Sequence, residues 1–127
     1  MGYGSQGKSE TGGVLERTKQ FALQIIRLYS SLPKTTEAQV IGKQLLRSGT
    51  SVGAHIREGK RSRSDAEMIS KIEVALQELE ETQYWLELLT DATIIRVDQL
   101  SNLFTEANEI TAILVTSVKT LKARKNK

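Results

Sequence analysis

Few side chains in this sequence have the chemistry of a catalytic or metal-binding site. His55 is the only histidine, and Ser48, Thr50 and Ser51 are the hydroxyl residues nearest to it. A nucleophilic hydroxyl needs a base, an orienting acid and an oxyanion-binding loop, and the sequence shows no sign of the last two. A di-iron bundle needs several inward carboxylates with Glu-x-x-His pairs, whereas His55 and Glu58 stand in the reverse order. The sequence therefore predicts no catalytic residues, no metal and no cofactor.

His55 is better interpreted as a polar residue of the core or of an interface between subunits. An imidazole can donate and accept hydrogen bonds near neutral pH, so a contact with nucleic acid is the alternative.

Positive charge gathers at two places along the chain. The first cluster lies in and after the second half of the second helix and consists of Arg47, Arg57, Lys60, Arg61 and Arg63. The second cluster lies at the C-terminus and consists of Lys119, Lys122, Arg124, Lys125 and Lys127. Clustered cations bind the phosphates of RNA or DNA, which makes the first cluster the candidate nucleic-acid site. Cations near a helix C-terminus are also stabilised by the helix dipole, and these cations could form ion pairs with the acidic third helix of another subunit, so this alternative stays open.

The segment between these clusters is acidic. From Asp65 to Asp91 its only basic residue is Lys71. Glu73, Glu80 and Glu87 recur every seven residues, which places them on one face of a helix. We interpret this face as a solvated stripe or one that forms ion pairs between helices.

The whole-chain composition fits one helical domain. The 127 residues include 39% hydrophobic and 26% charged residues, one proline and no cysteine, with a net charge of +3. The lack of cysteine excludes disulfides and thiolate chemistry. No apolar run approaches the ~18 residues that span a bilayer, and no secretory signal is evident, so we expect no membrane association and a cytoplasmic location.

Apolar residues recur at helical spacing in four segments. The first runs from Val14 to about Ser31, before Pro33. Thr36 with Gln39, and Ser64 with Glu67, are typical capping boxes that start the second and third helices, and Asp98 is the expected cap of the fourth. Gly59 is predicted to end the second helix in a left-handed conformation, and the third should run to about Asp91.

These segments define the expected domain boundaries. We expect residues 1–13, which hold five of the nine glycines, to be a disordered tail or the remnant of an expression tag. Residues 14–123 should form an all-α, antiparallel up-down-up-down four-helix bundle, because the connections are short. Residues 124–127 would be a basic C-terminal tail.

Three glycines inside the second helix predict an unusual contact. Gly42, Gly49 and Gly53 each cost a helix up to ~1 kcal/mol relative to alanine. Close packing of a neighbouring helix is the favoured explanation, and contact between the helix backbone and a ligand is the alternative.

The third helix carries a second apolar stripe besides its core seam. Val74, Trp85 and Leu88 lie on a different side from Leu79 and Leu86. A second stripe needs a second surface to cover it, so these three residues predict a homo-oligomer interface. The alternative is that Trp85 lies at the rim of the core of its own chain.

At residues 47–64 and 76–89 the chain resembles a known family. The runs RSGTSVGAHIREGKRSRS and LQELEETQYWLELL are similar to the four-helix-bundle proteins encoded by intervening sequences in bacterial 23S ribosomal RNA genes. The matching residues are Arg47, Ser48, Ser51, Ile56, Glu58, Gly59, Arg61 and Ser64. His55 departs from the motif, where Asn is commoner.

The resemblance covers about residues 14–123 and implies several properties. It implies an all-α bundle that assembles into a ring-like homopentamer and has no established enzymatic activity. It also implies a distant relationship to the accessory variability determinant of diversity-generating retroelements, which binds nucleic acid and works beside a reverse transcriptase.

Two functions therefore remain at the level of the sequence. The first is an oligomeric accessory protein that binds structured RNA or an RNA–DNA hybrid through its basic cluster, with a reverse transcriptase as a protein partner. The second is a structural or protein-interaction module whose partner docks on the Val74, Trp85 and Leu88 stripe.

Overall fold

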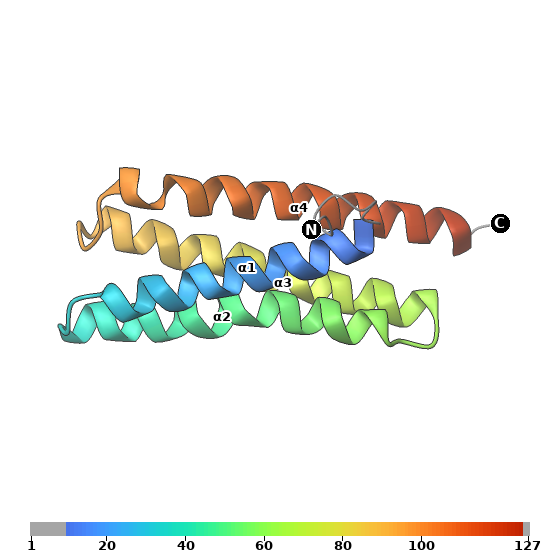
Figure 1. The fold of residues 1–127 in the computed structure, drawn as a ribbon, viewed down its shortest axis with the longest axis horizontal. Coiled ribbons are helices and arrows are strands. Elements are labelled where there is room, and N and C mark those ends of the chain that lie inside the picture. The colour runs from blue at the N-terminus through green and yellow to red at the C-terminus, as the bar shows by residue number, and fades with distance from the viewer. Residues whose placement is uncertain (1–9, 126–127) are drawn as a thin grey trace, which may run out of the picture.

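The computed structural model describes residues 10–125, which form four α-helices (Figure 1). They are α1 (Glu10–Ser31), α2 (Thr36–Lys60), α3 (Asp65–Asp91) and α4 (Val97–Lys125). Each helix contacts the next one, and α1 also contacts α4. Between residues 10 and 125 there is no strand, so the all-α prediction is confirmed. The arrangement is consistent with the expected antiparallel bundle, whereas the pentameric ring stays a prediction.

The ends of the bundle differ from the sequence prediction. α1 begins at Glu10, so residues 10–13, which we assigned to the tail, are helical. α4 continues to Lys125, two residues beyond the predicted end of the bundle. The remainder of the two predicted tails, residues 1–9 and 126–127, lies outside the described residues.

Two predicted features of α2 are wrong in detail. Thr35 caps this helix in place of Thr36, because its side-chain oxygen accepts a hydrogen bond from the Ala38 backbone N–H at 3.3 Å. Gly59 lies inside the helix, and no described glycine has a positive φ. Gly59 serves packing instead, since a Cβ there would lie 3.3 Å from the Cβ of Lys71 on α3.

At the starts of α3 and α4, the predicted cap Ser64 is confirmed and the predicted cap Asp98 is wrong. Ser64 caps α3 by accepting from the Glu67 backbone N–H at 3.1 Å. Glu67 returns a bond to the N–H of Arg63, one residue before the position expected in a capping box. Asp98 lies in the first turn of α4, where it pairs with Arg96 at 3.0 Å.

The core runs along the whole bundle. Its largest fully buried apolar side chains are Phe21 and Ile25 of α1, Leu45 and Val52 of α2, Leu79, Leu86 and Leu89 of α3, and Leu100, Ile110 and Leu114 of α4. Ile41 of α2 and Met68 of α3, which apolar spacing also places on the core side of their helices, are only half-buried. Three polar side chains, Thr18, Ser48 and Thr82, are fully buried with them.

The glycines of α2 allow α1 to approach closely. A Cβ on Gly42 would lie 2.6 Å from Leu32 Cδ1, and one on Gly49 would lie 2.8 Å from Ile25 Cγ1. These distances are shorter than two carbon atoms tolerate. The close-packing explanation is therefore confirmed for Gly42 and Gly49, and it removes the need for a ligand there.

This packing gives a stability prediction. Gly49→Ala should destabilise the protein by about 1–3 kcal/mol, because the new methyl group would overlap three atoms of Ile25 in a filled core. Gly13→Ala is the matched control: nothing lies within 4 Å of the position that its methyl group would take, so alanine should raise stability by up to about 1 kcal/mol. Urea unfolding would measure both changes. Equal effects of the two substitutions would contradict the packing explanation.

Candidate nucleic-acid interface

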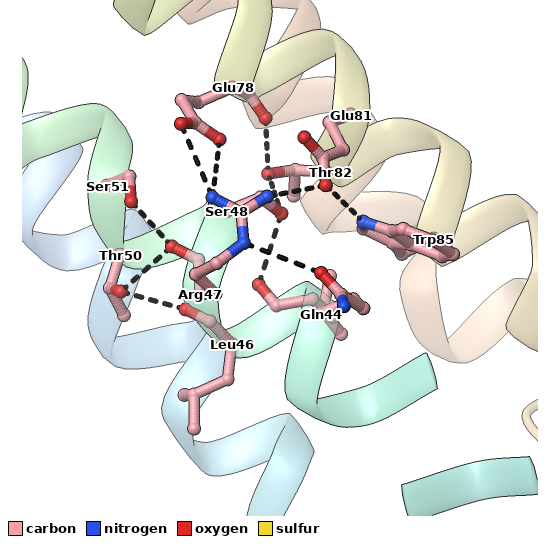
Figure 2. Close-up of polar contacts among 11 residues, drawn as sticks. Gln44, Leu46, Arg47, Ser48, Thr50, Ser51, Glu78, Glu81, Thr82 and Trp85 are labelled. Atoms are coloured by element: carbon pink, nitrogen blue, oxygen red, sulfur yellow. Dashed lines mark hydrogen bonds and ion pairs between the residues drawn. The ribbon is translucent and has the colours of Figure 1, made fainter. Parts of the chain in front are cut away.

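Arg47 and Ser48, near the middle of α2, contact α3 (Figure 2), and the next residue, Gly49, packs against α1. The Arg47 guanidinium binds two carboxylates of α3, with Nη1 at 3.1 Å from Glu78 Oε1 and Nη2 at 2.5 Å from Glu81 Oε2. Ser48 Oγ lies 2.8 Å from Thr82 Oγ1, and both side chains are fully buried. Gly49 contacts α1, as described above. The segment Arg47-Ser48-Gly49 therefore fastens α2 to both of its neighbours.

Arg47 thus has a partner inside its own chain. Its hydrogen bond is the main cause that lowers the pKa of Glu81 below the ordinary value for a glutamate. The sequence left open ion pairs between the cluster and the acidic third helix of another subunit. In the structure Arg47 pairs with that helix within its own chain, which argues against a role for Arg47 in nucleic-acid binding.

Trp85 belongs to the same polar group. Its indole N–H donates a hydrogen bond to Glu81 Oε2 at 3.1 Å. Its ring packs edge-to-face with the ring of Tyr84, and the two ring centroids are 5.1 Å apart. Trp85 is half-buried and packs against the core, whereas Tyr84 is 53% exposed. Val74 and Leu88 are half-buried on α3. The interface predicted for Val74, Trp85 and Leu88 stays a prediction. The packing of Trp85 against the core agrees with the alternative that it lies at the rim of the core of its own chain.

The remaining cations of the basic cluster lie at the end of the bundle, at the turn between α2 and α3. Arg57, Lys60, Arg61 and Arg63 are exposed. Among the described residues, none of the four makes an ion pair. We call Lys60, Arg61 and Arg63 the turn cations.

The acids near this turn already have other partners. Glu58 pairs with Lys71 at 3.0 Å, and this contact is the main cause that lowers the pKa of Glu58. Asp65 pairs with Arg124 at 2.9 Å, and Glu67 accepts the backbone N–H of Arg63. None of these three acids therefore forms an ion pair with a turn cation.

The C-terminal basic cluster lies at the same end. Figure 1 places the end of α4 beside the α2–α3 turn, and the Asp65–Arg124 pair joins them. Lys122 pairs with Glu73 at 3.5 Å, while Lys119 is exposed. Sequence reasoning treated the two clusters separately, because only the fold brings residues so distant in the chain together.

The side chain of His55 lies close to the carboxylate of Glu58. Its Nδ1 atom is buried, lacks a hydrogen bond with any described residue and lies 3.5 Å from Glu58 Oε1. Between residues 10 and 125 no group of three or more histidine, aspartate or glutamate side chains has a metal-binding arrangement. None of the described helices is long and apolar enough to cross a membrane.

Comparisons with known proteins agree with the resemblance noted from the sequence. A family model described as "23S rRNA-intervening sequence protein" matches residues 10–116. A crystal structure from Bacteroides thetaiotaomicron, of a protein with unknown function from the S23 ribosomal protein family, is 38% identical. The match covers 87% of this chain and 99% of that chain, with a TM-score of 0.83. The search of curated proteins gave no significant match.

The Arg47–Glu81–Trp85 contacts predict a pH-dependent signal from the single tryptophan. Trp85 fluorescence should change as Glu81 takes up a proton, at a pH below the ordinary glutamate range. Because the pKa of Glu81 is lowered in the folded state, the contact stabilises the protein above that range, and this contribution is lost as the pH falls through the lowered pKa.

Arg47→Gln should move the fluorescence transition to higher pH and reduce stability at pH 7 by less than about 1 kcal/mol, since the pair is partly solvated. The difference in stability between the two proteins should vanish at low pH. A fluorescence transition at the same pH in both proteins would show that Arg47 does not act on Glu81.

Proposed function

The chain belongs to the 23S rRNA-intervening sequence protein family, and we propose that it is a non-enzymatic accessory factor that binds structured RNA or an RNA–DNA hybrid. The turn cations carry this proposal. They lie at one end of the bundle without ion-pair partners among the described residues, while the neighbouring Glu58 and Asp65 pair with Lys71 and Arg124. A polyanion is the ligand that such uncompensated charge attracts.

The composition of the turn favours recognition of the phosphate backbone. Arginine presents a planar fork that matches two phosphate oxygens, and lysine acts as a point charge. No aromatic residue occurs from Gly59 to Ser64, so the turn offers no surface on which a base would stack. The ligand would therefore be recognised by its shape and charge, with little dependence on sequence.

We extend this proposal to assembly, location and partner. A homopentameric ring, which the family resemblance implies, would repeat the basic end around an axis and turn weak phosphate contacts into higher avidity. A reverse transcriptase is the partner that the same resemblance implies. The proposed location is the cytoplasm, which agrees with a chain without cysteine.

A second candidate function is that of a protein-interaction module. The observation that favours it is the exposure of Tyr84 beside Trp85, near the half-buried Val74 and Leu88. Trp85→Ala would then abolish binding of the protein partner or of a second copy. Retention of both would refute this function.

The nucleic-acid proposal is tested by neutralising the turn cations. The triple variant Lys60→Gln, Arg61→Gln and Arg63→Gln should weaken binding of structured RNA at least ~10-fold at low salt. The slope of the logarithm of the binding constant against the logarithm of the salt concentration should become less negative by roughly two to three. Each lost phosphate contact contributes about 0.7–0.9 to this slope. Fluorescence anisotropy at several salt concentrations would measure both quantities.

Arg47→Gln is the matched control for this experiment. It removes one positive charge that is paired with Glu78 and Glu81, so binding of the same RNA should stay within about twofold of the original protein. Circular dichroism would confirm that both variants retain their helices. Unchanged affinity in the triple variant would show that the turn is not the binding site.

A further inference from the structure

The last turns of α4 lie at the same end of the bundle as the turn cations (Figure 1). Lys119 is exposed and makes no ion pair within residues 10–125. Lys122 lies 3.5 Å from Glu73, and its side chain is 57% exposed. Arg124 pairs with Asp65, the first residue of α3. The end of α4 therefore adds exposed positive charge to the end of the bundle that holds the turn cations.

The Asp65–Arg124 pair links these two groups of cations. Arg124 donates hydrogen bonds through Nε and Nη2, at 3.3 Å and 2.9 Å, to the two oxygens of the Asp65 carboxylate. Arginine binds two oxygens of a phosphate group through the same planar fork. Asp65 therefore occupies the position on Arg124 that a phosphate group would take.

This ion pair is open to solvent, so a phosphate group could replace the carboxylate at little cost. The side chain of Arg124 is 60% exposed and that of Asp65 is 35% exposed. Ion pairs between such exposed groups contribute little to stability. After the exchange Asp65 would still lie in the first turn of α3, where the helix dipole favours a negative charge. The exchange would therefore leave no buried charge without a partner.

The two groups of cations are spread widely enough to select an extended ligand. α4 packs against α3, and the axes of packed helices lie about 8–10 Å apart. Along α4, the rise from Lys119 to Arg124 is about 7.5 Å. A single phosphate group would contact one of these cations, whereas a nucleic-acid backbone presents a row of phosphates that can contact several.

We infer that the nucleic-acid site extends from the turn cations over the end of α4, and that Asp65 competes with the ligand for Arg124. The inference rests on the proposed function and adds Lys119 and Arg124 to its contacts. Backbone phosphates bind the turn cations and Lys119 directly, while one phosphate replaces Asp65 on Arg124. Asp65 thereby lowers the affinity of the site and disfavours ligands with too few phosphates to displace it.

Substitutions at Asp65 and Arg124, alone and together, test this exchange in the full chain. The measurement is fluorescence anisotropy with a labelled RNA hairpin. Asp65→Asn should tighten binding about three- to tenfold, because it frees the Arg124 guanidinium. In an Arg124→Gln background the same substitution should change the affinity less than twofold, because the fork that it would free is absent.

Two further substitutions test the contacts of α4 with phosphate. Lys119→Gln and Arg124→Gln should each weaken RNA binding about twofold or more. Each should also make the slope of the logarithm of the binding constant against the logarithm of the salt concentration less negative by about 0.7–0.9. A residue that acts only on the stability of the helix would leave this slope unchanged.

Asp98→Asn is the matched control for Asp65→Asn. Asp98 also forms an exposed ion pair with an arginine, Arg96, at 3.0 Å. It lies about 40 Å from Arg124 along α4, far beyond the Debye length of about 10 Å at 0.1 M salt. This substitution should therefore leave the RNA affinity within twofold of the original. Circular dichroism would establish that each variant retains its helices.

The outcomes separate this inference from the proposed function. Equal effects of Asp65→Asn and Asp98→Asn, or a gain in affinity that persists without Arg124, would overturn the inference. If the triple variant of the turn cations lost RNA binding while substitutions at Asp65, Lys119 and Arg124 had no effect, the proposed function would stand and the inference would fall. An original protein that does not bind the hairpin would overturn both.

Discussion

The contact between the middle of α2 and its two neighbours is the constraint on which the bundle depends. Arg47 binds the acids of α3, Ser48 shares a buried hydrogen bond with Thr82, and Gly49 admits Ile25 of α1. Each of these two hydroxyls also lies within hydrogen-bond distance of a carbonyl of its own helix, so their mutual hydrogen bond is expected to add about 0.5–1.5 kcal/mol to the register of α2 against α3. The turn that follows is consequently held at a defined end of a rigid hairpin.

The distribution of ion pairs explains why that turn is the functional candidate. Carboxylates of the acidic helix α3 form ion pairs with Arg47 of α2 and with Lys122 and Arg124 of α4. Lys71 of α3 also pairs with Glu58 of α2, so ion pairs connect α3 to both α2 and α4. The turn cations receive none of this compensation. Structural and functional charges are thus separated along a single chain: paired cations stabilise the bundle, and those at the turn provide the proposed attraction for a polyanion.

The sequence predicted the helices well because apolar spacing, Pro33 and the Ser64 cap are local signals. It failed where tertiary packing overrides a local signal, as at Gly59, which serves the approach of α3 in place of a left-handed helix end. The positive charge of the basic cluster was visible in the sequence, but the partners that distinguish Arg47 from the turn cations lie 31 and 34 residues away. The hollow between α1 and α2 that Lys19, Gly53 and Arg57 line was not predicted, because it depends on side chains from two helices.

A double-mutant cycle on Ser48 and Thr82 tests the central claim most directly. Urea unfolding of Ser48→Ala, Thr82→Val and the double variant would give the coupling free energy between the two side chains. The account predicts a coupling of about 0.5–1.5 kcal/mol, because removal of either hydroxyl leaves the other without its interhelical partner. Strictly additive effects would contradict the claim that this contact fastens α2 to α3.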